Sequence, residues 1–221
     1  GGPATLSGST LTITGAGSVT VRASQAGNSS YSPATSVDRT ITVAKATASI
    51  TLSNLARTYT GSPQVASVAT TPVGLTVDVT YQGSATVPSN AGSYTVVANV
   101  NESNYQGTAT GTLVIAKADQ TISFATLADR VFGDVAFTLS ATSTSGLPVS
   151  FSIFSGPASL SSNIVTLTGT GTVTVRATQA GNTNYNAATA VDRSFLVTAP
   201  TADFASWSAS RFTEEELANS A

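Results

Sequence analysis

Residues 3–43 and 157–197 carry nearly the same sequence, 154 positions apart and without a gap. The two copies are identical at 24 of 41 aligned positions, and most other positions exchange Ser for Thr or one aliphatic residue for another. An internal repeat this close predicts an array of small modules. A repeated unit suits stacking, whereas a catalytic site usually occurs once. The sequence therefore indicates how the chain is built more strongly than what it does.

Few charges and many β-branched residues characterise the chain. Charged residues make up 9%, far below the roughly 25% of an ordinary soluble domain. The abundant Thr and Val fit the pleated, half-buried surface of a strand. We therefore predict an all-β fold. A Ser/Thr-rich, charge-poor β protein without cysteine also fits an extracellular or cell-surface location in bacteria better than the cytosol.

Missing residue types exclude several kinds of chemistry. The sequence holds no Cys and no His, which rules out disulfides, Cys/His zinc sites, thiol nucleophiles and a Ser-His-Asp triad. Its nine Lys and Arg residues stand singly, so no basic patch for a phosphate backbone is expected. No apolar run approaches the roughly 20 residues of a membrane span. We expect no enzymatic activity, no catalytic, cofactor-binding or metal-binding residues, no nucleic-acid partner and no membrane span.

Two similar junctions divide the chain. Val43-Ala44-Lys45-Ala46 and Ile115-Ala116-Lys117-Ala118 lie 72 residues apart, and each stands between two alternating apolar stretches. We interpret them as short linkers at module boundaries. The predicted pieces are 1–46, 47–117, 118–198 and 199–221.

The third piece, 118–198, shows the module most fully. Short alternating strands separated by turn residues predict a β-sandwich. In the strand near its end, Val173, Val175 and Ala177 should face the core while Thr172, Thr174 and Arg176 face water. The predicted strands are 121–125, 136–142, 148–154, 164–168, 172–178 and 193–198.

The first piece matches only part of that module. Residues 1–46 correspond to 155–200, so they have no counterpart of 118–154. We expect a truncated half-module of three strands, less stable than the others because its apolar face is uncovered. That face would carry Leu11, Ile13, Val19, Val21, Ile41 and Val43.

The middle piece shares the ending of its neighbours. Gly92–Ala98 aligns with Gly17–Ala23 and Gly171–Ala177, and a polar loop then reaches Tyr105, which matches Tyr31 and Tyr185. All three modules thus follow one plan. The tail differs: Asp203 can cap a short helix carrying Phe204 and Trp207, and Thr213–Glu216 has capping-box form, so we predict a short helical C-terminal tail that begins a linker or another domain.

The middle piece resembles the MBG ("mostly beta, glycine-rich") repeats. The resemblance is carried by Arg57–Gln64, Thr71–Leu75, Asn90–Tyr94 and the closing Thr112–Ala118. The flanking pieces resemble a companion bacterial immunoglobulin-like module through Ser145–Val149, Gly156–Ala158 and Gln179–Asn182. The resemblance implies tandem immunoglobulin-like sandwiches in a large bacterial surface or secreted protein, with no enzymatic activity and no binding residues to carry over.

Several residues are candidates for a specific role. Tyr94 after Asn90-Ala91-Gly92 is typical of a tyrosine corner, where a hydroxyl pins a loop to the backbone, and we expect the same structural role for Tyr31, Tyr105 and Tyr185. The pairs Arg22/Asp38 and Arg176/Asp192 recur in both copies and predict cross-strand ion pairs, with a catalytic Asp-Arg pair as the less favoured alternative.

Three weaker alternatives remain open. Asp119, Asp129 and Asp134 could bind Ca²⁺ at a module junction, although dispersed carboxylates rarely do. Lys45 and Lys117 could form isopeptide cross-links with Asn, a chemistry that needs a buried site. Thr12-Ile13-Thr14 and Thr172-Val173-Thr174 could form a flat glycan- or ice-binding array, although outward Thr on ordinary strands explains them equally well.

We favour a structural spacer or stalk whose partners are the neighbouring repeats of the same chain. The alternative is an adhesin whose modules bind a cell-surface glycan or protein through a patch shared between repeats. An enzyme ranks third, because without His or Cys it would need a glycosidase-like carboxylate pair.

Overall fold

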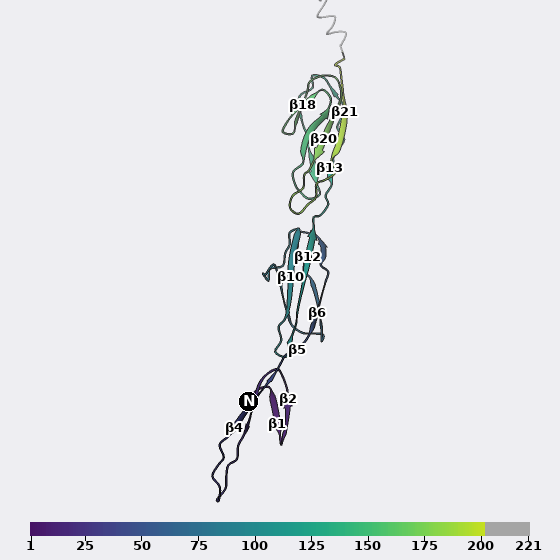
Figure 1. Cartoon of the computed structure of the whole chain (residues 1–221). Coiled ribbons are helices and arrows are strands. Elements are labelled where there is room, and N and C mark those ends of the chain that lie inside the picture. The colour runs from purple at the N-terminus through teal and green to yellow at the C-terminus, as the bar shows by residue number, and fades with distance from the viewer. Residues whose placement is uncertain (202–221) are drawn as a thin grey trace, which may run out of the picture. The chain divides into compact units, whose positions relative to one another are not determined.

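A computed structural model describes residues 1–201, and every regular element within that range is a β-strand (Figure 1). The chain divides into two compact units, residues 1–117 and 118–221. The prediction of an all-β fold is therefore confirmed for the described part of the chain. The predicted helical turns at Asp203 and Thr213 lie outside the described residues.

Residues 1–43 form two antiparallel strand pairs. In the first pair a turn at Gly8, where φ is +60°, joins the strands, and in the second the register runs from Gly17↔Val43 to Ala23↔Val37. The sequence predicted three strands and missed the first, whose residues are mostly exposed and carry no clear apolar alternation. The strands are β1 (Ala4–Ser7), β2 (Thr10–Ile13), β3 (Gly17–Ala23) and β4 (Val37–Val43).

The rest of the first unit holds its main core. A four-stranded sheet has the order β7-β12-β10-β9, and the separate pair β6-β8 packs against it through Leu52. Buried Val96, Leu113 and Ile115 lie at the centre of this core. The strands are β5 (Ala46–Thr47), β6 (Ser49–Ser53), β7 (Ala56–Thr58), β8 (Ser67–Thr71), β9 (Val77–Tyr81), β10 (Gly92–Val100), β11 (Tyr105–Gln106) and β12 (Thr108–Ala116).

The second unit also has one core, to which the residues of several sheets contribute. The sheets have the orders β14-β21-β20-β17, β15-β19-β18 and β13-β16. Val173, Val175 and Ala177 are fully buried, as predicted, while Thr172 is exposed and Arg176 half-buried. The strands are β13 (Ile122–Phe124), β14 (Arg130–Val131), β15 (Phe137–Thr138), β16 (Ala141–Ser143), β17 (Ser150–Ser155), β18 (Ala158–Ser161), β19 (Ile164–Leu167), β20 (Gly171–Thr178) and β21 (Val191–Thr198).

The predicted strand 136–142 is wrong as a single element. β15 pairs with β19, whereas β16 pairs with β13, so the chain changes sheets between them. Leu139 sits at the change, buried, with its N–H donating to the Asn163 carbonyl at 2.7 Å. Alternation along the sequence reports which side chains face inward, but not that the backbone switches partners. The sequence also missed the short strands β14 and β18.

The last residue of each predicted junction pairs with a second strand or bridge residue. Ala46 in β5 pairs in parallel with Tyr105 in β11, and Ala118 forms a parallel bridge with Tyr185. The Ala118 N–H donates to the Asn184 carbonyl at 2.9 Å. In each unit, this pairing joins the start of a module to the segment that contains Tyr105 or Tyr185.

The two copies of the repeat have the same local structure. The β20–β21 register, from Gly171↔Val197 to Ala177↔Val191, reproduces that of β3–β4 residue for residue. Gly2 and Gly156 both have positive φ, +123° and +101°. A Cβ on Gly2 would lie 2.2 Å from the Ser18 carbonyl oxygen of β3, and a Cβ on Gly156 would lie 2.3 Å from the Thr172 carbonyl oxygen of β20. Both positions therefore require glycine.

We expect Gly156→Ala to lower the free energy of unfolding of the second unit by about 3 kcal/mol, since backbone strain and steric collision each cost on the order of 1–3 kcal/mol. Gly133→Ala is the matched control, because its φ is +104° but a Cβ there meets nothing within 4 Å. Denaturant unfolding measures both. Equal losses in the two variants would show that the collision at Gly156 is not real.

Candidate functional site

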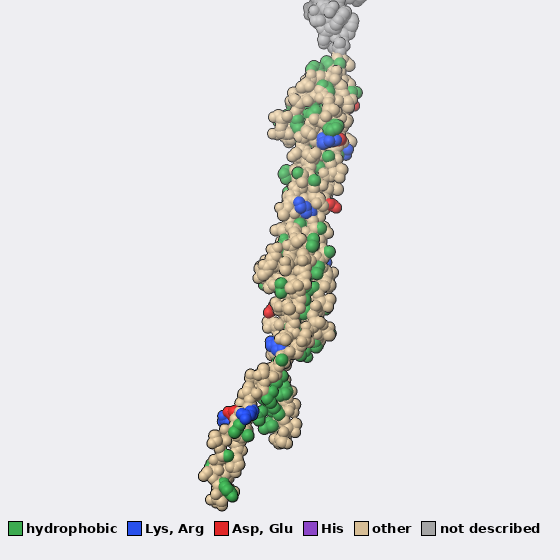
Figure 2. All heavy atoms as spheres, in the orientation of Figure 1, with side chains coloured by type: hydrophobic (Ala, Val, Ile, Leu, Met, Phe, Trp, Pro, Cys, Tyr) green, Lys and Arg blue, Asp and Glu red, His purple; other side chains and the backbone are tan. Residues whose placement is uncertain are grey.

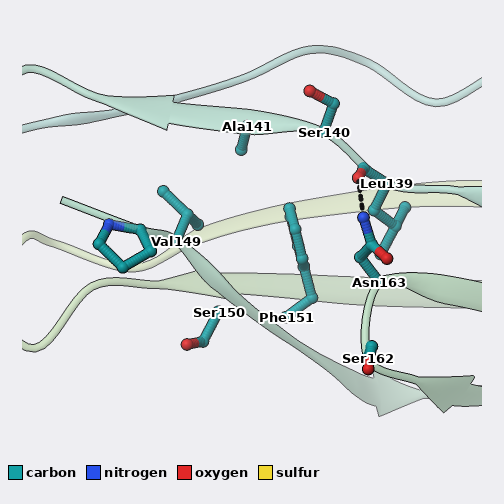
Figure 3. Close-up of a pocket in the computed structure, with 9 residues that line it drawn as sticks. Leu139, Ser140, Ala141, Val149, Ser150, Phe151, Ser162 and Asn163 are labelled. Carbon is teal, nitrogen blue, oxygen red and sulfur yellow. Dashed lines mark hydrogen bonds between the residues drawn. The ribbon is translucent and has the colours of Figure 1, made fainter. Parts of the chain in front are cut away.

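A hollow with a volume of about 650 Å³ lies in the second unit (Figure 3). The side chains of Val149 and Phe151 point toward the strand that carries Ala141. The hydroxyls of Ser140 and Ser150 point away from that space. Its lining is Leu139, Ser140, Ala141, Pro148, Val149, Ser150, Phe151, Ser162 and Asn163, none of which is charged.

The polar groups of this pocket do not converge on a reacting centre. The Asn163 side-chain amide donates to the Leu139 carbonyl at 3.3 Å, so it closes the pocket wall. Serine hydroxyls need a neighbouring base to become nucleophiles, and no lining residue supplies one. The pocket can therefore offer an apolar floor and scattered hydroxyls to a neutral ligand, but no acid–base pair.

Both predicted Arg–Asp ion pairs form, and they have the same geometry. The Arg22 guanidinium donates twice to Asp38, at 2.7 and 2.8 Å, and Arg176 donates twice to Asp192, at 2.8 Å each. In each pair the hydrogen bond from the arginine holds the aspartate pKa below its usual range. The pairs lie on exposed strand faces, where each partner satisfies the other, so they support the structural interpretation.

An aromatic side chain that the sequence analysis missed joins the second pair. The Arg176 guanidinium lies 3.9 Å from the ring centroid of Phe154, which is 57% exposed. The β17–β20 register shifts between Ile153 and Ser155. The alternation of β17 places Ile153 against the core and the ring of Phe154 on the outward face.

The tyrosines divide into pinned and exposed residues. The Tyr94 hydroxyl donates to the Asn90 carbonyl at 3.0 Å, which confirms the predicted tyrosine corner. Tyr105 and Tyr185 are half-buried. The structural role expected for Tyr31 is wrong, because its side chain is 73% exposed. Residues 1–43 contain no counterpart of Ala118, the residue that pairs with the equivalent Tyr185.

Tyr81 has a role that the sequence analysis overlooked. Its ring is buried in the first unit, and its hydroxyl accepts the Ala66 N–H at 3.0 Å. The alternation of Val77, Val79 and Tyr81 along this strand predicts that the Tyr81 side chain faces the core.

The three candidate calcium ligands do not come together. Asp119 accepts the Asn186 side-chain amide at 2.8 Å, Asp129 accepts the Leu196 N–H at 2.7 Å, and Asp134 accepts the Val131 N–H at 3.0 Å. No group of three potential ligands occurs anywhere in residues 1–201. Each carboxylate instead stabilises its own turn or strand edge, so the geometry does not support a calcium site.

The two lysines considered for isopeptide bonds lie on the surface. Lys45 and Lys117 are both exposed, and the Lys45 ammonium donates to the Glu102 carbonyl at 2.6 Å. The Glu102 carboxylate accepts the Thr76 N–H at 2.9 Å, a bond that lowers its pKa. Because both side chains are exposed, neither position offers the buried amine that the cross-link needs.

The Thr-rich faces differ between the two copies. Thr20 and Thr40 lie across from each other on β3–β4 with their hydroxyls 3.3 Å apart. At the equivalent positions the second unit has Thr174 and Ser194, and Leu196 takes the place of Thr42. Of the two Thr-x-Thr runs, Thr12 of β2 lies opposite Thr5, whereas Thr172 and Thr174 of β20 lie opposite Leu196 and Ser194, so the runs do not form one common Thr array.

Comparisons with known proteins identify one domain. The family model described as "MBG domain" matches residues 48–119. No curated protein sequence matches the chain. Among solved structures, an endo-fucoidan hydrolase of glycoside hydrolase family 107 matches with 15% identity and a TM-score of 0.25, over 90% of this chain and 37% of that protein. The chain thus spans about a third of that hydrolase, and the TM-score is too low to indicate a common fold. No helix in residues 1–201 is long and apolar enough to cross a membrane.

We expect Arg176→Gln to raise the pKa of Asp192 toward the ordinary aspartate value of about 3.9, because the arginine hydrogen bond is the largest cause of its depression. Carboxyl NMR titration measures the change. Asp38 is the internal control, since its pKa depends on Arg22.

The same substitution should flatten the acid dependence of stability. The pKa of Asp192 is lower in the folded chain than in the unfolded chain, so the ion pair stabilises the fold above about pH 4. This contribution disappears as the pH falls through the folded-state pKa. A variant whose stability falls with acid as steeply as the wild type would refute the role of the pair.

Tyr94→Phe should cost about 1 kcal/mol of unfolding free energy, because the Asn90 carbonyl loses its hydroxyl partner. Tyr31→Phe, at an exposed position, should change stability by less than about 0.5 kcal/mol. Thermal unfolding of the two variants measures whether the Tyr94 hydroxyl contributes to stability. An equally small loss in both variants would contradict a structural role for this hydroxyl.

Proposed function

We propose that this chain, which carries an MBG domain at residues 48–119, is a non-enzymatic structural spacer of tandem immunoglobulin-like β-sandwiches in a bacterial surface or secreted protein. The observation that carries the proposal is the flanking repeat. The β3–β4 and β20–β21 pairs, on either side of the MBG domain, have the same register, turn glycines and ion pair. Repetition of a whole strand framework suits a chain that gains reach by adding modules.

The packing of each unit supports the sandwich part of the proposal. In the second unit, Phe195 of the four-stranded sheet and Phe137 of the three-stranded sheet meet edge to face, with ring centroids 5.7 Å apart. In the first unit, Leu52 of the β6-β8 pair packs against the buried cluster of the four-stranded sheet, which includes Val96 and Leu113. Two layers that share one apolar interior are the basic form of a β-sandwich.

The absence of reactive side chains supports a passive role. The sequence has no Cys and no His, and no titratable residue lines the hollow beside Phe151. The partners we propose are the neighbouring modules of the same chain, and the location we propose is extracellular.

An adhesin is the second candidate, and one observation favours it. Phe154, stacked on Arg176 and exposed, presents an aromatic face of the kind that sugars and peptides contact.

Small-angle X-ray scattering tests the spacer. A compact globule of this length has a radius of gyration of about 17 Å, and we expect a value at least about one and a half times larger. A value near 17 Å would overturn the spacer role. For the adhesin, a glycan array probed with the wild type and with Phe154→Ser should show binding that the substitution removes.

A further inference from the structure

Two arginines differ from the other arginines of residues 1–201 in their lack of a hydrogen-bond acceptor. The Nε atoms of Arg57 and Arg130 are buried without a hydrogen-bond partner, and neither side chain forms an ion pair within the described chain. Buried polar atoms nearly always have a partner, so an unpaired one needs an explanation. In the same range, four arginines donate from the guanidinium to an oxygen: Arg22, Arg39, Arg176 and Arg193.

The two unpaired arginines occupy equivalent positions in their units. β7 and β14 are the first strands of the two four-stranded sheets, and each pairs in parallel with the long strand beside it. Arg57 lies opposite Ile115, and Arg130 lies opposite Val197. Because Ile115 and Val197 are buried, the stem of each arginine lies on the core face of an edge strand. This placement explains why Nε is buried.

The surroundings of Arg130 hold its guanidinium in place but leave its charge unpaired. Its Cζ atom lies 4.5 Å from the ring centroid of Phe137, and that ring meets Phe195 edge to face. The nearest acidic residues in the sequence do not pair with it. Asp129 and Asp134 each accept a backbone N–H instead. The aromatic platform therefore orients a cation that has no counter-ion among the described residues.

Each arginine also borders apolar surface. Only Nε is buried in this way, so the terminal amino nitrogens of Arg57 and Arg130 reach solvent. The turn after Arg57 presents Val65, and the turn after Arg130 presents Phe132 and Val135, all exposed. Figure 2 shows few charged side chains, scattered among uncharged atoms. Each unit thus offers one oriented cation beside an apolar surface, without a second cation to recognise a multiply charged anion.

The chemistry of these positions favours a ligand that carries repeated carboxylates. Guanidinium groups bind carboxylates through two parallel hydrogen bonds, as the Arg22–Asp38 and Arg176–Asp192 pairs do in this chain. A single exposed pair of this kind contributes little to affinity. Repeated sites on the protein therefore matter only for a ligand that is itself a repeat. A sugar ring adds an apolar C–H face, which suits an exposed aromatic side chain.

We propose that Arg57 and Arg130 are two equivalent binding sites for the carboxylates of an acidic polysaccharide composed of uronic acid residues. Each carboxylate accepts two hydrogen bonds from the terminal amino groups of one arginine. The C–H face of the sugar lies against the exposed apolar residues of the following turn. This binding goes beyond the spacer role, which small-angle scattering tests separately, and it uses residues other than Phe154.

NMR of the arginine Nε–H groups tests the proposal on the full chain, with oligogalacturonate as the probe. We expect the Nε–H signals of Arg57 and Arg130 to shift on titration, and those of Arg22 and Arg176, which already have carboxylate partners, to stay in place. On a molar basis a long oligogalacturonate should bind at least about tenfold more tightly than monomeric galacturonate, because it engages more than one site.

Substitutions assign the signals to the two sites. Arg57→Gln should remove the response of the first unit and leave that of Arg130, and Arg130→Gln should do the reverse. Arg130→Lys keeps the charge without the paired donors and should also weaken binding. Arg39→Gln is the matched control, since it removes one exposed arginine with the same change of charge and should leave both responses intact.

Three results would overturn the proposal. One is the absence of any shift at Arg57 and Arg130 with oligogalacturonate. Another is an equal shift with neutral dextran, which would show that the carboxylate is not recognised. The third is tighter binding of polyglutamate than of oligogalacturonate, which would identify an acidic polypeptide as the partner instead of a polysaccharide.

Discussion

Coverage of one apolar sheet face is the constraint on which the rest of this structure depends. Strands that alternate apolar and polar residues give every sheet a face that must leave water. In the second unit, residues of β13, β15 and β17 belong to or pack against the core that contains Val173, Val175 and Phe195. In residues 1–43 the strand pair β3–β4 has the same register; of the face expected to be uncovered, Ile13 and Ile41 are exposed, but Val19 is buried.

This constraint explains why nearly equal sequences differ in their contribution to stability. Full burial of a large apolar side chain contributes about 1.5–3 kcal/mol, and Phe195 obtains it while Ile41 does not. Polar interactions depend on the same cover. Gln120 closes a buried hydrogen-bond network in the second unit, whereas Gln25 remains at the surface. The surface ion pairs are independent of it, and they form in both copies with the same geometry.

The functional picture follows from what repeats and what does not. Turn glycines, ladder register and ion pairs recur, and they serve the framework of a module. The pocket beside Phe151 and the stacked Phe154 lie in the second unit, and most of the residues that form them belong to 118–154. A role as spacer depends on the features that recur in both copies, and any ligand recognition by this unit's own features depends on the pocket and Phe154 of the second unit.

The sequence by itself determined the all-β class, most strand positions, the inward residues of β20, the tyrosine corner at Tyr94 and both ion pairs. Each depends on local periodicity or on residues that one strand pair brings together. Tertiary structure alone decided that 136–142 divides between two sheets, that Tyr31 stays exposed and that Phe154 stacks on Arg176. These outcomes depend on which distant strand lies on a face or edge, and alternation within a strand carries no information about that partner.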